Sequence, residues 1–282
     1  MELSNPSVLK ALLAKHGFSF SKGLGQNFLI DPSVCPRMAD GCGATASDGV
    51  LEIGPGVGVL TKELALRAKK VVAVELDDRL FPILDETLAD FGNVSVVHGD
   101  ALKIDLASLL AERFADCGRV FVCANLPYYI TSPVIMRLLE ERLPIAALTV
   151  MVQKEAAERL CASVGSREAG AVTVAVAYHA DPRVLFSVGR GSFLPSPNVD
   201  SAVIRLDLRG SDADAAFEKR LFAAVRAGFN QRRKTLVNSL SSAGFDKADV
   251  LAALEGAGLP VAVRAEALTM QNWKDFVSRL AK

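Results

Sequence analysis

Short apolar runs alternate with amphipathic stretches along the first 160 residues of the chain. The apolar runs predict buried strands at 50–53, 71–75, 94–98, 120–124 and 146–152. Between and around them, apolar residues recur at helical spacing at 5–17, 32–41, 59–68, 78–90, 106–115, 132–142 and 153–163. The alternation predicts an α/β fold, in which helices cover both faces of a mostly parallel sheet.

The pattern changes after residue 170. Two strand-like runs, 171–180 and 184–188, are followed by a loop that contains Pro195 and Pro197 and by a strand at 201–208. Because no long helix separates these late strands, we expect an antiparallel pair at the edge of the sheet.

A polar, turn-rich stretch at 207–212 precedes a remainder that is helical throughout. Its helices are predicted at 214–227, 232–242, 246–256 and 271–280. We therefore expect two domains, residues 1–208 with the sheet and residues 209–282 with a small group of helices.

Glycines or polar residues lie at the carboxyl ends of four of the predicted strands. The first runs into a turn in which glycines alternate with other residues from Gly54 onward, and the next three lead to Glu75, Asp100 and Asn125. Glycines let backbone N–H groups approach a ligand, and a carboxylate at the tip of the second strand can accept both ribose hydroxyls. The turn alone could be an ordinary strand-to-helix connection, and its spacing misses the dinucleotide fingerprint by one position. The four ends together favour a site for a nucleoside-containing cofactor.

The fourth strand ends in the motif Asn125-Leu126-Pro127-Tyr128. An exocyclic amine of a nucleobase delocalises its lone pair into the ring, and two hydrogen-bond acceptors on its protons localise that pair for attack on an electrophile. The Asn125 side-chain oxygen and the Leu126 carbonyl can supply both acceptors, Pro127 stiffens the turn, and Tyr128 offers a ring for stacking. In isolation the motif could also be a turn with a packed aromatic ring.

These motifs resemble those of Rossmann-like methyltransferases that use S-adenosylmethionine to modify amino groups. Three further stretches, 25–29, 129–133 and 193–201, narrow the resemblance to the ribosomal RNA adenine N6,N6-dimethyltransferases. The similarity is greatest to members that modify two adjacent adenines near the 3′ end of bacterial 16S ribosomal RNA. It extends from about residue 20 through Gln231–Thr235.

The resemblance implies roles for individual residues around the cofactor. Asn27 and Leu29 would close the N-terminal segment over S-adenosylmethionine, and Gly54 would contact its amino-acid end. Glu75 would hold the ribose and Asp100 the adenine.

The resemblance also implies how the target base is held. Asn125 would stand between the cofactor and the target adenine, and Phe193 would stack on that base opposite Tyr128, although it could instead be a core aromatic. The chain departs from the family at Asn198, where the family often has a lysine. This change removes one possible phosphate contact without touching the chemistry.

Six basic residues and no acidic one lie between Lys219 and Asn238. Such a helical face is often only solvated surface, but beside an RNA-modifying domain it favours contact with phosphates. The candidate RNA-binding residues are Arg226, Arg232, Arg233, Lys234 and, near the N-terminus, Lys22.

Composition limits the alternatives. Formal net charge is zero, so RNA binding must depend on local patches, and the five cysteines show no metal-ligand spacing. With neither a signal peptide nor an apolar run of membrane-spanning length, we expect a cytoplasmic protein. We also expect a monomer without metal, and the resemblance implies 16S ribosomal RNA in a 30S subunit or its precursor as the substrate. The alternatives are a 23S ribosomal RNA adenine dimethyltransferase of the macrolide-resistance type and a non-catalytic ribosome-assembly factor on the same fold.

Overall fold

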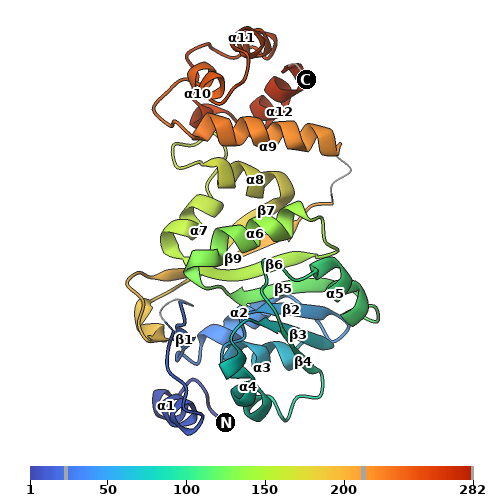
Figure 1. Cartoon of the computed structure of the whole chain (residues 1–282), viewed down its shortest axis with the longest axis vertical. Coiled ribbons are helices and arrows are strands. Elements are labelled where there is room, and N and C mark those ends of the chain that lie inside the picture. The colour runs from blue at the N-terminus through green and yellow to red at the C-terminus, as the bar shows by residue number, and fades with distance from the viewer. Residues whose placement is uncertain (22–24, 211–213, 281–282) are drawn as a thin grey trace. The chain divides into compact units, whose positions relative to one another are not determined.

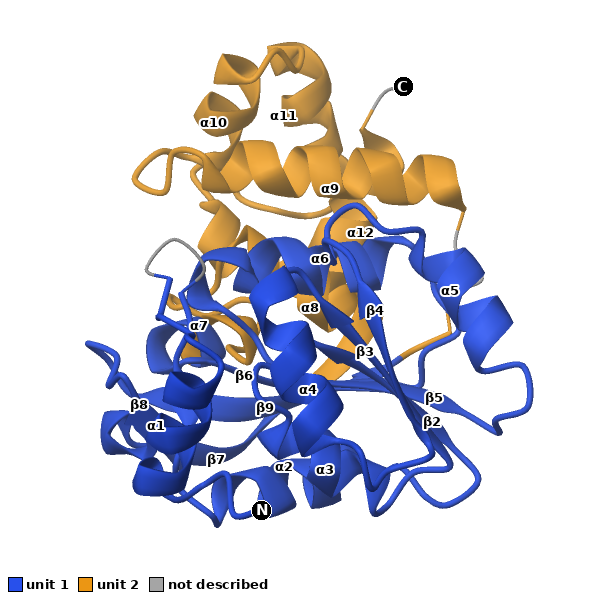
Figure 2. Ribbon diagram, turned by 60° about the horizontal axis from the view of Figure 1, so that its bottom comes forward, with its two compact units in different colours: residues 1–157, 182–208 blue, residues 158–181, 209–282 orange. Residues whose placement is uncertain are grey.

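The computed structural model describes residues 1–21, 25–210 and 214–280 of the chain (Figure 1). Its contacts define two compact units, residues 1–157 with 182–208 and residues 158–181 with 209–282 (Figure 2). The expected first domain, residues 1–208, therefore differs from the first unit, because residues 158–181 pack with the C-terminal helices.

A seven-stranded sheet forms the centre of the first unit, in the order β4-β3-β2-β5-β6-β9-β7. The first five strands in this order are parallel to their neighbours, and β9 runs antiparallel to β6. This arrangement confirms the predicted fold class. The strands are β2 (Gly49–Ile53), β3 (Lys70–Glu75), β4 (Val94–His98), β5 (Val120–Asn125), β6 (Ala147–Gln153), β7 (Ala180–Val188) and β9 (Ser201–Leu208).

The strands β2 and β6 are nearly continuous apolar runs because both faces of the sheet are covered. On one face, α2 and α3 pack their apolar side chains against β2, β3 and β5 in a shared core. A separate two-stranded ladder pairs β1 (Phe28–Leu29) with β8 (Phe193–Leu194). The helices are α1 (Pro6–Lys15), α2 (Val34–Cys42), α3 (Val59–Ala65), α4 (Phe81–Thr87), α5 (Leu106–Arg113), α6 (Thr131–Glu140) and α7 (Lys154–Leu160).

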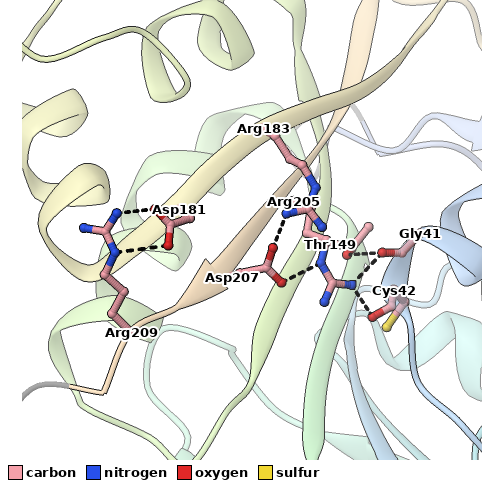
Figure 3. A network of polar contacts seen from close by, with 8 residues as sticks. All are labelled: Gly41, Cys42, Thr149, Asp181, Arg183, Arg205, Asp207 and Arg209. Carbon is pink, nitrogen blue, oxygen red and sulfur yellow. Dashed lines mark hydrogen bonds and ion pairs between the residues drawn. The ribbon is translucent and has the colours of Figure 1, made fainter.

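Arg205 of β9 anchors the end of α2 to the sheet (Figure 3). Its guanidinium donates hydrogen bonds to the carbonyl oxygens of Gly41 at 2.7 Å and Cys42 at 2.5 Å, and to the Asp207 carboxylate at 2.7 Å. Arg183 of β7 pairs with the same carboxylate. The last carbonyls of a helix lack intrahelical partners, so the partly buried cation of Arg205 satisfies them and complements the helix dipole.

The second unit is helical in every element that lies wholly within it. Trp273 and Phe276 of α12 are fully buried in its core. Among the described residues of both units, no helix is long and apolar enough to cross a membrane. The helices of this unit are α8 (Ala171–His179), α9 (Ala215–Phe229), α10 (Leu236–Ser242), α11 (Lys247–Gly256) and α12 (Met270–Arg279).

The prediction of a strand at 171–180 is wrong, because this segment forms α8. The helix begins where the Gly170 N–H donates to Thr173 Oγ1 at 2.9 Å, and that hydroxyl in turn donates to the Arg159 carbonyl oxygen at 2.7 Å. Packing against α9 and α12 stabilises a valine-rich segment as a helix despite its strand propensity.

Candidate active site

A cavity of about 340 Å³ lies at the carboxyl ends of β2, β3, β4 and β5 in the first unit. A volume of a few hundred Å³ is typical of sites for small ligands, and this edge of an open α/β sheet is where ligands bind. The predicted site residues that line it are Asn27, Gly54, Glu75, Asp100, Asn125, Leu126, Pro127, Tyr128 and Phe193.

The floor of the cavity begins with the glycine turn between β2 and α3. Gly54 and Gly56 have φ angles of 71° and 60°, in the left-handed region that other residues rarely adopt. A Cβ atom on Gly56 would lie 3.1 Å from the Phe28 ring, so a side chain there would also crowd the N-terminal segment. The turn therefore exposes backbone to the cavity without side chains in the way.

Glu75 ends β3 with its carboxylate almost fully buried in the cavity wall. Its Oε1 atom accepts hydrogen bonds from the N–H groups of Leu76 and Asp77, both at 2.8 Å. Burial raises the pKa of Glu75 above its usual value, and these backbone donors offset only part of the effect. A ligand that donates hydroxyl hydrogens to this carboxylate would favour its ionised form.

The N-terminal rim of the cavity is attached to the tip of β3 by a network that the sequence did not reveal. The Gln26 amide donates to Asp77 Oδ2 at 2.7 Å, and Arg79 donates to both carboxylate oxygens of Asp77 at 2.8 and 2.6 Å. The Arg79 guanidinium holds the pKa of Asp77 below its usual value. Gln26 belongs to the 25–29 motif, but its partner 51 positions later has no signal in the spacing of the chain.

Asp100 lies in the loop after β4. Its Oδ1 atom accepts the Leu102 N–H at 2.9 Å, and Lys103 lies 3.3 Å from Oδ2. The Leu102 N–H foremost, and the lysine after it, hold the pKa of Asp100 below its usual value, so the group is a carboxylate at neutral pH. It can accept a hydrogen bond from an amine in the cavity.

Asn125 is the last residue of β5 and lies opposite Met151 of β6 in the parallel ladder. Its amide nitrogen lies 3.5 Å from the Asn27 carbonyl oxygen, which orients the amide. Within the described ranges the amide oxygen has no hydrogen-bond donor, so it is available as an acceptor. The Tyr128 hydroxyl is hydrogen-bonded to Ser201 Oγ at 2.7 Å, which fixes the ring at the cavity wall.

Two of the predicted site residues, Phe193 and Leu29, are buried in the structure. Phe193 lines it but is only 3% exposed, and it lies opposite Leu29 in the β1–β8 ladder. Leu29 does not line the cavity, because its side chain packs into the core formed by α2, α3 and the sheet. In this structure Leu29 holds the N-terminal segment by packing.

Glu52 of β2 is a second buried carboxyl group, two residues before Gly54, to which the sequence assigned no separate role. It is 1% exposed, and no described group makes a hydrogen bond to its Oε2 atom. Burial raises its pKa to about 8, so the group carries a proton at neutral pH.

The candidate RNA-binding residues of the second unit occupy α9 and the turn between α9 and α10. Arg226, Arg233 and Lys234 are exposed. Arg232 donates to the carbonyl oxygens of Arg167 at 2.8 Å and Ala169 at 3.2 Å, so it also has a structural role within this unit. Lys22 lies outside the described residues.

Three features are typical of the class of Rossmann-like methyltransferases. They are the mostly parallel sheet, the glycine turn after β2 and the Asn125–Tyr128 motif at the end of β5. The model of the ribosomal RNA adenine dimethylase family matches residues 17–282, and the chain belongs to this family. The resemblance noted in the sequence is thereby confirmed, and with it the assignment as an enzyme.

Similar proteins agree with this assignment. The ribosomal RNA small subunit methyltransferase A of Bacillus licheniformis is 46% identical, over 99% of this chain and 97% of that protein. The protein of the same name from Geobacillus thermodenitrificans is also 46% identical, over 99% of this chain and 97% of its own. Among solved structures, the 23S ribosomal RNA methyltransferase ErmE is 29% identical, with a TM-score of 0.69 over 91% of this chain and 100% of that one. A dimethyladenosine transferase from Plasmodium falciparum is 26% identical, with a TM-score of 0.72 over 88% of this chain and 95% of that one.

Proposed function

We propose that this enzyme uses S-adenosylmethionine to dimethylate N6 of two adjacent adenines near the 3′ end of 16S ribosomal RNA, in the 30S subunit or its precursor. The observation that carries the proposal is the convergence of Glu75, Asp100 and Asn125 on one cavity at the carboxyl edge of the sheet. A ribosomal RNA substrate also favours a cytoplasmic location, where ribosomal subunits are assembled.

The cavity residues fit S-adenosylmethionine. Glu75 has the buried carboxylate that a ribose diol requires, Asp100 can accept the adenine amine, and the glycine turn leaves room for the amino-acid end. The bound cofactor supplies an electrophilic methyl group on a positively charged sulfur. The residues of the chain therefore have to bind the cofactor, orient the target amine toward its methyl group and exclude water.

Asn125 and Leu126 would orient the target amine. The Asn125 amide oxygen and the Leu126 carbonyl oxygen would accept hydrogen bonds from its two N–H groups, which localises the nitrogen lone pair toward the methyl group. Tyr128 and Phe193 would stack on the two faces of the base, which has to leave its RNA stack to reach the cavity. No strong base is needed, because the amine proton becomes acidic only as the nitrogen–carbon bond forms.

RNA affinity would come largely from phosphate contacts of Arg226, Arg233 and Lys234. These exposed cations are concentrated in one helix and the turn after it. Such contacts release counterions, so binding should weaken steeply with salt.

The experiment that tests the proposal compares substrates. Purified enzyme with radiolabelled S-adenosylmethionine should label small-subunit particles that lack the modification, and digestion of the RNA should yield N6,N6-dimethyladenosine. Labelling of 50S-derived RNA alone would favour the macrolide-resistance type of activity. Cofactor binding without labelling of either substrate would favour a non-catalytic assembly factor. The higher identity to small subunit methyltransferases than to ErmE supports the first outcome.

A further inference from the structure

Arg137 of α6 donates hydrogen bonds to two backbone carbonyl groups of the loop that carries Asp100. Its Nη1 atom donates to the Ala101 carbonyl oxygen at 2.8 Å, and its Nη2 atom donates to the Ile104 carbonyl oxygen at 2.7 Å. The side chain is only 17% exposed, so these bonds are largely protected from water. The two acceptors are three residues apart in the chain and flank Leu102.

The same loop sets the position of the Asp100 carboxylate. Asp100 Oδ1 accepts the Leu102 N–H at 2.9 Å, and the carbonyl oxygen of Asp100 accepts the N–H groups of Lys103 and Ile104 at 2.8 and 2.9 Å. Because Asp100 and Leu102 both line the cavity, a shift of this loop would move the carboxylate relative to a bound nucleoside. Arg137 bridges the loop to α6 through its two hydrogen bonds.

The chemistry of the guanidinium suits this role. Its planar fork presents several N–H donors in fixed directions, whereas a lysine ammonium is a single point that cannot bridge two separated carbonyl groups in the same way. The remaining side of the guanidinium is occupied by Glu141, whose Oε1 atom accepts from Arg137 Nε at 2.5 Å. The hydrogen bonds of the arginine thus go to the loop carbonyl groups and to Glu141, and its positive charge also helps to lower the pKa of Asp100.

We propose that Arg137 is a positioning residue for cofactor recognition, which fixes the Asp100 loop so that the carboxylate meets the exocyclic amine of adenine. This inference rests on the proposed function, because it assumes that the cavity holds an adenosyl group. It predicts that loss of Arg137 weakens recognition of the adenine amine in particular, beyond any general loss of binding.

The test compares two ligands that differ at that amine. S-adenosylhomocysteine carries it, whereas S-inosylhomocysteine has a carbonyl oxygen there, which a carboxylate repels, and a hydrogen on the adjacent ring nitrogen. Calorimetry on the full-length protein should show that the wild type prefers the adenosyl ligand by about 10- to 150-fold, the contribution of one charged hydrogen bond. In Arg137→Ala the preference should fall to about threefold or less, with Arg137→Lys between the two.

Glu141→Gln is the matched control, because it removes the ion pair of Arg137 and leaves Arg137 and both of its carbonyl acceptors, Ala101 and Ile104, in place. It should keep the wild-type preference. If Arg137→Ala does not fold, Arg137→Gln, which is shorter, uncharged and lacks the guanidinium fork, provides the same comparison with Arg137→Lys.

Three outcomes would overturn the inference. The first is an unchanged preference in the arginine variants. The second is an equal loss of both ligands, which would mean that Arg137 only supports the fold. The third is a wild type that binds neither ligand, which would overturn the proposed cofactor itself and is distinguishable from the first two without any variant.

Discussion

The cavity at the carboxyl edge of the sheet and the basic turn between α9 and α10 contribute to the proposed function by opposite physical means. In the cavity, Glu75 and Asp100 are held by backbone N–H groups, and Asn125 is oriented by a neighbouring carbonyl. In the turn, Arg233 and Lys234 are exposed to solvent. Preorganised groups in a site shielded from water act strongly and are little affected by salt, whereas exposed charges act weakly and are screened.

The largest effect is expected from Asn125→Ala. Loss of one preorganised hydrogen-bonding group costs other enzymes about 100- to 1,000-fold in turnover. The rate of methyl transfer in a single turnover, with cofactor and RNA both saturating, should fall by that amount. RNA affinity should change little, because we propose that it comes mostly from phosphate contacts in the second unit.

The same substitution at Asn230, an exposed asparagine just after α9, is the matched control and should leave the single-turnover rate unchanged. A rate within about threefold of wild type for Asn125→Ala would remove this residue from the catalytic role, since the expected loss is far larger.

The buried carboxyl group of Glu52, unlike the exposed charges of the turn, should make the free energy of unfolding depend on pH. Its pKa is raised from the usual 4.5 to about 8 in the folded protein, so the native state retains a proton that the unfolded chain releases. The stability from this group is complete below pH 4.5 and is lost as the pH rises through about 8. Over this range the free energy of unfolding should fall by up to about 1.4 kcal/mol per pH unit on account of Glu52.

Glu52→Gln, a neutral residue of similar shape, should flatten this part of the pH dependence measured by urea unfolding. Glu112→Gln, at an exposed position of α5, should not. If Glu52→Gln and the wild type show the same slope, the carboxyl group is ionised in the folded protein and the proposed burial effect is wrong.

The features that could be predicted from the sequence are those that depend on residues close together in the chain. The alternating strands and helices and the residues at the strand ends depend on local periodicity and on one topological rule, so they could be predicted. The α8 segment could not, because Ala171 to His179 is apolar on nearly all sides and its period is uninformative. Only the packing of α8 against α9 and α12 distinguishes a buried helix from a buried strand there.

The supports of the site were invisible for a related reason. Gln26 and Asp77 meet across 51 positions, and Arg137 reaches a loop 33 to 36 positions earlier. A motif names the group that meets the ligand, but the side chains that hold this group in place lie wherever the fold brings them. Arg232 is a case in which a residue chosen from its sequence also has a structural role. Its positive charge predicted contact with RNA, and in the structure its guanidinium donates hydrogen bonds to two backbone carbonyl groups.

A smaller effect than that of Asn125 is expected from Glu75→Ala. The ribose diol would lose its charged acceptor, and each such hydrogen bond contributes about 1.5–3 kcal/mol, or roughly 10- to 150-fold in Kd. Calorimetry with S-adenosylhomocysteine should show this loss in a variant that remains folded, because the residue lies at a strand tip. Glu112→Ala, which removes an exposed glutamate, is the control and should bind as the wild type does. Unchanged affinity in Glu75→Ala would contradict the ribose assignment.

The smallest effect is expected from the exposed turn, in the double variant Arg233→Ala with Lys234→Ala. RNA affinity should fall, and its dependence on salt should become shallower by about one unit of slope for each phosphate that the variant no longer neutralises. Methylation at saturating RNA should remain close to wild type, because neither side chain lines the cavity. Lys69→Ala with Lys70→Ala removes the same charge at the amino end of β3, where both lysines pair with Asp116, and should not change the slope. The separate single variant Arg232→Ala should also lower the melting temperature, because Arg232 donates hydrogen bonds to the carbonyl groups of Arg167 and Ala169. A salt dependence that stays the same in the double variant would show that this turn is ordinary solvated surface.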